Sequence, residues 1–353
     1  MKGKSKELVF VVVGLTALWN FWNPASALSV ASPGNPGSPT VHRIKLDSRF
    51  DQLISPDSVV ERLAEGFTWV EGPLWNANDQ MLLFSDIPAN SVFAWKAGKG
   101  ISLFLHPSGY LGNTPFTGKE SGSNGLTWDS TGRLVLCQHG DRRIVRLEQD
   151  GQFTILADRY QGRRLNSPND LVYRPNGDLY FTDPPFGLPK QFHDPSKELP
   201  FQGVYRLTPQ GRLDLLIQDV IAPNGLAFSP DATKLYVTDV NPKRPAWLVY
   251  DVLSDGTMTN GRVFADATPW RKDPYFGPDG VKVDRDGNVW GARPGGINIF
   301  ASDGILLGMI ETGMPTSNLN WGEDGSVLFI TGGSAIYRLK TLTGGETLPP
   351  APQ

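Results

Sequence analysis

The sequence predicts an all-β protein, folded as a six-bladed β-propeller with a metal site at its centre. Three observations lead to this prediction. A short motif that begins with Asn, Asp or Glu recurs along the chain, and each copy opens a strand-like run that is followed by a turn and a second run. The 39 Gly and 29 Pro are scattered among these runs as turn residues are. No stretch of useful length has the period of a helix.

Six copies of the motif set the number of blades. The first residues of the four clear copies are 45, 55 and 55 residues apart, near the repeat of roughly 40–50 residues expected for four-stranded blades. The clear copies are Asn124-Gly125-Leu126, Asn169-Asp170-Leu171, Asn224-Gly225-Leu226 and Asp279-Gly280-Val281. The weaker copies are Glu71-Gly72-Pro73-Leu74 and Asn318-Leu319-Asn320-Trp321.

Second and third strands follow each copy. The expected second strands cover residues 81–85, 133–136, 178–182, 234–238, 288–291 and 326–331, and the third strands cover 92–95, 144–147, 203–207, 248–252, 296–300 and 335–339. Residues 59–63 are expected to supply the outer strand of the last blade, which would close the ring and protect the sheet edges. A β-sandwich also has many short strands, but it would not repeat a three-strand unit with the same polar residue at the same place.

The N-terminal segment has the composition of an export signal. Three lysines within the first six residues precede an apolar run over 8–19, and Ala25-Ser26-Ala27 supplies the small residues of a cleavage site. Residues 1–27 are therefore predicted to be a signal peptide that sends the protein to the periplasm or the medium. A retained membrane anchor is the alternative, although this run is shorter than the roughly 20 residues that a spanning helix needs.

The remaining chain divides by composition. Residues 28–40 are rich in Pro, Gly and Ser and are expected to form a flexible linker. The propeller domain is expected over 41–345, with a short C-terminal tail over 346–353.

Composition also narrows the classes of function. Charged residues make up 20% of the chain and the formal net charge is −3, so neither nucleic acid nor a membrane is an expected partner after signal cleavage. Cys137 is the one cysteine, which excludes an intrachain disulfide, and its apolar surroundings favour a buried residue over a nucleophile. The oligomeric state is left open.

The polar residue that opens each motif is the candidate functional group. Asx residues are common in turns, yet these hairpins have turn residues of their own, such as Asn176-Gly177. Because the innermost strands of a propeller run along the central axis, equivalent residues of distant repeats meet at one mouth of the channel. Glu71, Asn169, Asn224 and Asp279 would then offer oxygen ligands to one divalent cation, with Ca²⁺ expected first and Mg²⁺, Zn²⁺ or Mn²⁺ as alternatives.

Several ordered motifs also carry a family resemblance. They are Val70-Glu71-Gly72-Pro73-Leu74-Trp75, Ser123-Asn124-Gly125-Leu126, Ser167-Pro168-Asn169-Asp170-Leu171, Phe181-Thr182-Asp183-Pro184-Pro185-Phe186-Gly187, Pro223-Asn224-Gly225-Leu226 and Pro278-Asp279-Gly280-Val281. Together they resemble the senescence marker protein/gluconolactonase/luciferin-regenerating-enzyme-like family, over essentially everything after Val41. The segment 136–143 is similar to the gluconolactonase branch in particular, in which it lines the pocket.

The resemblance implies a propeller whose metal ligands match Glu71, Asn224 and Asp279. Asn169 matches an Asn that binds the metal directly or through water or substrate. Some relatives carry Arg two positions before this Asn to hold the sugar, and this chain has Ser167 there instead. Substrate contacts therefore follow less directly from the resemblance than metal ligands do.

The implied activity is metal-dependent hydrolysis of a small-molecule sugar lactone. Asp279 is the first candidate for the general base, with a role as metal ligand alone as the alternative. His139 is the second candidate, because an imidazole titrates near neutral pH, although a lone His in a strand is more often a packed residue. Asn124 and Asn169 are candidate substrate contacts.

Other side chains near these motifs are candidates for substrate contact or for purely structural roles. Arg142 is a candidate contact for a product carboxylate, against a solvated residue at a strand end. Asp183 is expected to shape the pocket rim, and the rings of Trp69, Trp75 and Phe186 either stack on a sugar or belong to the core.

Two further functions fit the same pattern. The first is hydrolysis of other esters or organophosphates at the same metal site. The second is a non-catalytic propeller that binds a ligand or partner, with the metal holding the blades together. The second is disfavoured, since a purely structural ring does not need two carboxylates facing the channel.

Overall fold

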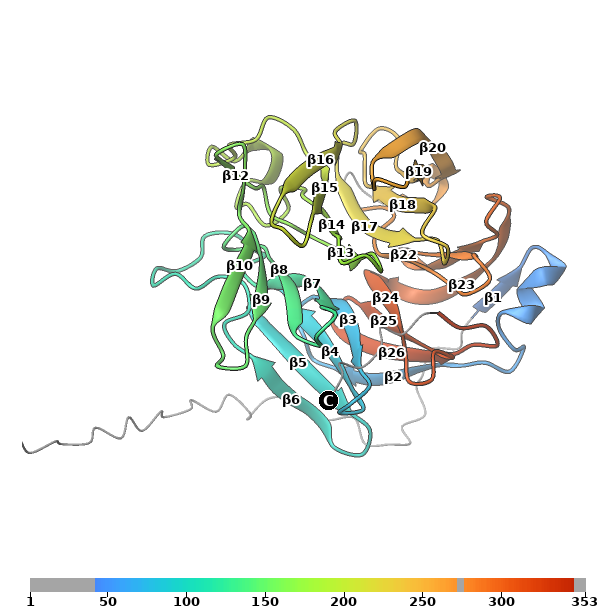
Figure 1. Ribbon diagram of the computed structural model, residues 1–353. Helices are drawn as coiled ribbons and strands as arrows, with labels where there is room; N and C mark the ends of the chain where they lie inside the picture. Colours follow the sequence, from blue (N-terminus) through green and yellow to red (C-terminus); the bar gives the residue numbers. More distant parts are fainter. Residues whose placement is uncertain (1–41, 272–275, 346–353) are drawn as a thin grey trace, which may run out of the picture.

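The computed structural model describes residues 42–271 and 276–345, which are almost entirely strands and turns. Six four-stranded antiparallel sheets are arranged around one centre (Figure 1). The innermost strand of each sheet contacts the innermost strand of the next, and the sixth contacts the first. The prediction of an all-β, six-bladed propeller is therefore confirmed.

Each of the first four blades is a continuous piece of chain. Their strands, from the innermost outward, are β3 (Val70–Asn76), β4 (Met81–Asp86), β5 (Ser91–Lys96) and β6 (Gly100–Leu105); β7 (Ser123–Trp128), β8 (Leu134–Gln138), β9 (Arg143–Leu147) and β10 (Phe153–Ala157); β13 (Leu171–Tyr173), β14 (Leu179–Thr182), β15 (Val204–Leu207) and β16 (Leu213–Ile217); and β17 (Pro223–Phe228), β18 (Lys234–Asp239), β19 (Ala246–Val252) and β20 (Met258–Asp266). A small hairpin of β11 (Arg159–Tyr160) and β12 (Arg163–Arg164) lies between the second and third blades in sequence.

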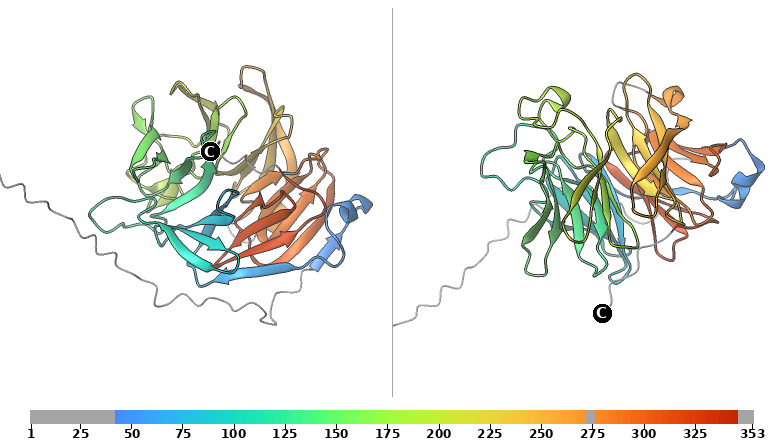
Figure 2. Two further views of the ribbon diagram at one scale, coloured as in Figure 1. Left: turned by 60° about the horizontal axis from the view of Figure 1, so that its bottom comes forward. Right: turned by 45° about the horizontal axis from the view of Figure 1, so that its top comes forward.

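The last two blades are completed by the N-terminal part of the chain. Their strands are β21 (Val281–Val283), β22 (Val289–Phe300), β23 (Leu306–Pro315) and β1 (His42–Lys45); and β24 (Asn318–Gly322), β25 (Val327–Gly332), β26 (Ala335–Lys340) and β2 (Val60–Glu65). β2 pairs antiparallel with β26 and runs beside it in both Figures 1 and 2, which confirms the predicted closing strand.

The fifth blade differs from the prediction in two ways. Residues 288–291 and 296–300 are not two strands, because β22 runs without a break from Val289 to Phe300 and pairs with β21 and β23 along different parts of its length. The third strand is therefore β23. Its outer neighbour is β1, with His42 opposite Glu311, so the N-terminal segment closes two blades where one was expected.

Several predicted segments lie outside the described residues: the signal peptide over 1–27, the linker over 28–40 and the tail over 346–353. Within the described ranges, no helix is both long enough and apolar enough to cross a membrane. Short 3₁₀ helices occur at η1 (Ser48–Gln52), η2 (Gln191–His193) and η3 (Thr268–Trp270).

The core consists of apolar layers between neighbouring blades. One layer, for example, joins Val204 of the third blade to Leu226 and Val237 of the fourth. Cys137 is fully buried in the layer between the second and third blades, and burial raises the pKa of its thiol. A buried thiol of this kind is a packing residue rather than a nucleophile.

Phe50 fastens the N-terminal segment to the ring. It lies in η1 between β1 and β2, is fully buried, and packs its ring against Gly308 of β23, with the guanidinium of Arg43 5.1 Å from the ring centre. We expect Phe50→Ala to lower the free energy of unfolding by about 3–5 kcal/mol, since it leaves a cavity where both closing strands are held. Urea denaturation measures this loss, and Phe104→Ala, at a ring that is 38% exposed, is the matched control. Equal losses in the two variants would contradict the role given to Phe50.

Candidate functional site

The innermost strands carry the predicted polar residues to the central axis. Glu71 lies on β3, Asn124 on β7 and Asn224 on β17, while Asn169 and Asp279 lie just before β13 and β21. At the first three positions the strand pairing contains a bulge, directly after Glu71 or at the Asn itself. A bulge releases a residue from the ladder and changes the direction of its side chain. At these three positions the bulge therefore frees the side chain from the regular strand pairing, so that it can face the central channel.

The residue after each of these groups lets the next blade come close. A Cβ at Gly72 would lie 2.3 Å from the carbonyl oxygen of Asn124, and one at Gly225 would lie 2.6 Å from that of Asp279. Gly125 donates its N–H to the carbonyl of Asn169 at 2.8 Å. Each motif therefore contacts the backbone of the next motif around the ring, which brings the side chains of distant repeats together.

Hydroxyl groups on the second strands donate hydrogen bonds to the same backbone. The Oγ atoms of Ser85, Thr182 and Thr238 donate to the carbonyls of Asn124, Asn224 and Asp279 in the following blade, at 2.8, 2.7 and 2.8 Å. All three hydroxyl residues are fully buried. These contacts link adjacent blades at the carbonyls of three candidate site residues.

A carboxylate follows each of these hydroxyls and holds the loop that leads into its own blade. Asp183 accepts hydrogen bonds from the N–H groups of Asn166 and Ser167, at 2.8 and 2.9 Å. Asp86 and Asp239 hold the equivalent loops in the first and fourth blades. The predicted role of Asp183 in shaping the pocket rim fits this geometry. The repeated Ser/Thr-Asp pair at the end of the second strand is a sequence signal that the motif search did not use.

The centre of the ring concentrates negative charge. Burial and the nearby Asp170 carboxylate raise the pKa of Glu71 to about 8, although Asn318 and the N–H of Gly72 donate hydrogen bonds to it. Burial and the Glu71 carboxylate also raise the pKa of Asp279 well above its ordinary range, against a hydrogen bond from Asn224. Carboxylates this close repel one another, so the site favours a positive charge between them.

Several buried oxygen atoms at this centre lack hydrogen-bond partners among the described residues. Among the described residues, Asn124 Oδ1, Asp170 Oδ2 and Asp279 Oδ1 are shielded from solvent and have no hydrogen-bond partner, although other parts of Asp279 are partly exposed. An unpaired buried acceptor is costly unless something donates to it or binds it. The amine of Lys282, 3.9 Å from Asp170 Oδ2, supplies one positive charge nearby.

This donor set fits a hard divalent cation. Carboxylate and amide oxygens are the ligands that Ca²⁺ and Mg²⁺ prefer, and the repulsion between Glu71 and Asp279 is what such an ion relieves. In the part of the chain that the structure describes, no three His, Cys, Asp or Glu side chains gather as a metal centre of that composition would. The amides of Asn224 and Asn169 are therefore the candidates that the sequence offers for the rest of a ligand set.

Two further residues, Asn318 and Glu120, interact with the carboxylates at the centre, and the motifs predicted no role for either. Asn318 opens the weak sixth motif on β24 and donates to Glu71. Glu120 precedes β7, and its Oε2 lies 2.9 Å from Nδ1 of His139, which directly follows β8 and is fully buried. The charge of Glu120 also acts on Glu71 and Asp279, so the pair stands near the carboxylate centre.

Arg142 is buried, which contradicts one of its two expected roles. It is buried, with a left-handed φ of 61°, so it is not a solvated residue at a strand end. Its guanidinium donates to the backbone carbonyls of Leu165, Asn166 and Ser196. These contacts fix the loop before Asn169 through Nε and Nη1, while Nη2 is buried and has no hydrogen-bond partner among the described residues. Contact between Arg142 and a product carboxylate therefore stays a prediction.

The aromatic candidates divide between rim and core. Trp75 stacks on Phe329 and is buried in the layer between the sixth and first blades. Trp69 is partly exposed and its ring lies 6.3 Å from that of Phe276, in the loop before Asp279. The ring of Trp69 is therefore accessible for stacking on a sugar, whereas Trp75 is a core residue.

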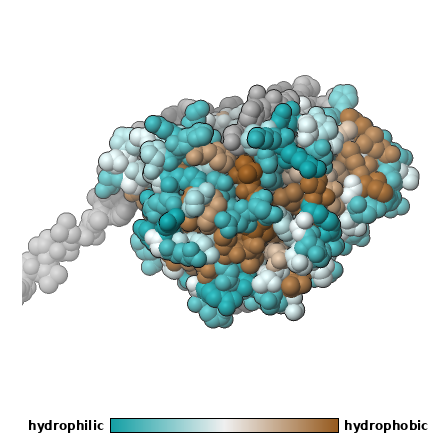
Figure 3. Space-filling view, turned by 90° about the horizontal axis from the view of Figure 1, so that it is seen from above, coloured by the Kyte–Doolittle hydropathy of each residue, from teal (hydrophilic) through white to brown (hydrophobic). Residues whose placement is uncertain are grey.

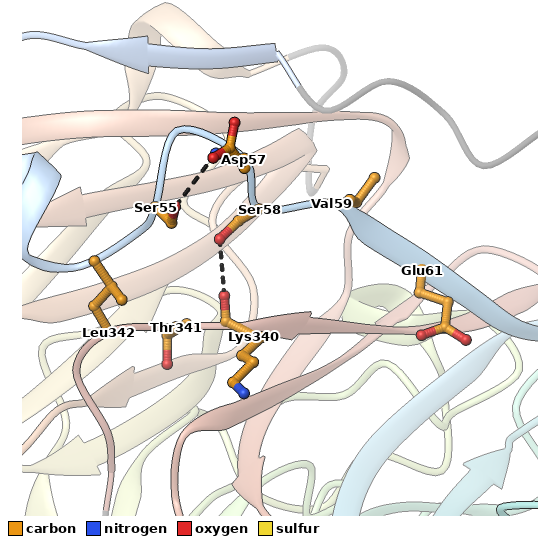
Figure 4. Close-up of a pocket in the computed structure, with 8 residues that line it drawn as sticks. All are labelled: Ser55, Asp57, Ser58, Val59, Glu61, Lys340, Thr341 and Leu342. Carbon is orange, nitrogen blue, oxygen red and sulfur yellow. Dashed lines mark hydrogen bonds between the residues drawn. The ribbon is translucent and has the colours of Figure 1, made fainter.

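Other surface features do not share the chemistry of the centre. The pocket in Figure 4 lies where the outer strand β2 meets the end of β26, and Ser58 Oγ closes part of it by donating to the Lys340 carbonyl at 3.2 Å. Figure 3 shows a largely hydrophilic face with hydrophobic side chains toward its middle and toward the edge where β1 lies. The carboxylate and amide set around the axis remains the candidate site.

Comparison with known proteins agrees with this fold. A gluconolactonase of Zymomonas mobilis is 40% identical over 311 residues, which cover 85% of this chain and 86% of that protein. The solved structure of a gluconolactonase from Xanthomonas campestris superposes with a TM-score of 0.74 at 33% identity, over 89% of this chain and 99% of that one. A lactonohydrolase of Aspergillus oryzae is 25% identical over 210 residues, covering 54% of this chain and 48% of that protein.

The fold and the site define a six-bladed propeller with an oxygen-lined centre on its axis, the class of the lactonase-type hydrolases. Residues 69–334 match the model of the SMP-30/Gluconolactonase/LRE-like region, and the chain belongs to that family. The predicted family and its gluconolactonase branch are confirmed, as is the enzyme class.

Proposed function

We propose that this protein hydrolyses a sugar lactone of the gluconolactone type at the centre of the ring, with one bound divalent cation, Ca²⁺ in first place. The observation that supports the proposal most is the group of unpaired buried oxygens beside two mutually repelling carboxylates. The names of the relatives support the substrate class. Export to the periplasm or medium is proposed from the composition of residues 1–27.

Glu71, Asn224 and Asp279, together with Asn169, would hold the cation. When bound, it would polarise the lactone carbonyl and stabilise the charge that develops on its oxygen. Asp279 has one oxygen left for this cation, since its carboxylate meets Asn224 while Oδ1 is unpartnered among the described residues. Asn124 offers an unpartnered buried Oδ1 to a substrate hydroxyl. The partly exposed ring of Trp69 would stack on the sugar.

The test is hydrolysis of glucono-δ-lactone and of aryl esters by the purified protein, with and without a chelator. We expect the lactone to be opened, the chelator to abolish turnover, and added Ca²⁺ to restore it. Preference for aryl esters would assign the site to the ester-hydrolase alternative. Turnover that a chelator does not change would overturn the cation-dependent mechanism, and folded, cation-loaded protein without any turnover would favour a binding propeller.

A further inference from the structure

The contact between Glu120 and His139 leaves the histidine ring only partly hydrogen-bonded. Nδ1 of His139 lies 2.9 Å from Glu120 Oε2, and the imidazole is fully buried while the carboxylate is partly exposed. Nε2 of the same ring is buried and has no hydrogen-bond partner among the described residues. A packed structural histidine normally satisfies both nitrogens. One nitrogen here is held, and none of the residues that the structure describes contacts the other.

The ring is held firmly on its other sides. A Cβ at Gly187 would lie 2.6 Å from the Cβ of His139 and 2.9 Å from that of Ser167, so the loop after β14 packs directly against the imidazole. The N–H of His139 donates to the carbonyl of Gly122, and the N–H of Arg142 donates to that of His139. The imidazole therefore has little freedom to turn, and its protonation pattern depends on what contacts Nδ1.

The pair also stands next to the carboxylate centre. Ser167, which packs against Gly187 as His139 does, is two positions before Asn169 in the loop that enters β13. The charge of Glu120 also raises the pKa of both Glu71 and Asp279. A carboxylate that accepts from Nδ1–H fixes the tautomer in which Nε2 is an acceptor. In hydrolases built on a carboxylate–histidine pair, the nitrogen opposite the carboxylate is the one that moves the proton.

We propose that Glu120 is the positioning residue of a Glu120–His139 pair, which keeps Nε2 of His139 unprotonated and ready to accept a proton during lactone opening. Nε2 takes one proton from the attacking water as its oxygen bonds to the carbonyl carbon. The ring C–O bond then breaks, and the departing oxygen takes that proton back from Nε2 and becomes the new hydroxyl. His139 ends neutral, and the other proton of the water leaves from the new carboxylic acid. This inference rests on the proposed function and assigns the proton transfer within it.

The tautomer is tested directly by NMR. The chain has four histidines, so ¹⁵N-histidine labelling gives a simple spectrum in which loss of one signal set in His139→Asn identifies His139. We expect long-range ¹H–¹⁵N correlations to show an Nδ1–H tautomer in the wild-type protein and its loss in Glu120→Ala. An Nε2–H tautomer in the wild type would overturn the proposal, whether or not the protein opens lactones.

Kinetics supplies the second arm at saturating Ca²⁺. We expect Glu120→Gln and Glu120→Ala to lower kcat for the lactone by about 10²-fold or more with little change in KM, because the residue that orients the proton acceptor His139 is lost while binding is kept. Glu148→Gln is the matched control, a partly buried glutamate paired with Arg146 on the second blade. Wild-type kcat in both Glu120 variants would overturn the proposal, whereas an inactive wild type with the Nδ1–H tautomer would contradict the proposed function and not the pair.

Discussion

Replacing Asp279 by Asn is expected to lower kcat/KM for a sugar lactone by about 10³-fold or more. The substitution keeps the shape of the side chain but removes one of the two carboxylates that would hold the cation. Glu71→Gln removes the other carboxylate, and both variants are expected to act mainly by weakening cation binding. Steady-state kinetics over a range of Ca²⁺ concentrations measures this weakening.

The pattern of rescue decides the role of Asp279. We expect high Ca²⁺ to restore much of the activity of both Glu71→Gln and Asp279→Asn, because the proposed proton acceptor is His139. An Asp279→Asn variant that stays inactive even when calorimetry shows a bound ion would make Asp279 the proton acceptor in place of His139. Asp57→Asn, at an exposed carboxylate beside the pocket in Figure 4, is the control and is expected to keep full activity.

The cation-free protein is expected to lose stability as the pH rises. Burial raises the pKa of Glu71 from 4.5 to about 8, so between these values the folded chain keeps a proton that the unfolded chain has released. Folding then takes up a proton, so the free energy of unfolding falls with increasing pH. The total fall is on the order of a few kcal/mol, and the curve levels off above about pH 8. The raised pKa of Asp279 acts in the same direction.

Urea denaturation at several pH values from 5 to 9, with chelator or with Ca²⁺, measures this dependence. Because a bound cation stabilises the charged carboxylates, we expect Ca²⁺ to remove most of the decline and to bind more tightly as the pH rises. Glu71→Gln has no carboxyl to titrate at this position, so its stability in chelator is expected to vary less with pH. If the free energy of unfolding has the same pH dependence with and without Ca²⁺, the ion does not bind at these carboxylates.

The blades and most of the centre could be predicted from the sequence because the propeller repeats its local chemistry. A motif such as Asn224-Gly225 carries both its functional side chain and the glycine that lets Asp279 approach, so one repeat predicts its neighbours. Asn318 belonged to the weakest copy, and its donation to Glu71 depends on the ring closing between the sixth and first blades.

The features that were missed depend on contacts between segments without a repeat. The pairing of β1 with β23 has no local signal in the chain. Arg142 looked like a strand-end residue because nothing nearby in sequence shows that the carbonyls of Leu165 and Ser196 surround it. Glu120 lies in a long connection before β7, and only the tertiary structure brings it to His139.

The use of N-terminal strands to complete the last two blades imposes an order on biosynthesis. β1 and β2 are among the first parts of the domain to leave the ribosome, yet β23 and β26 are among the last. Until those partners are made, the early strands have no ladder to join and the final sheets keep open edges. The ring therefore cannot be completed until β23 and β26 have been made, so its closure waits for both ends of the domain.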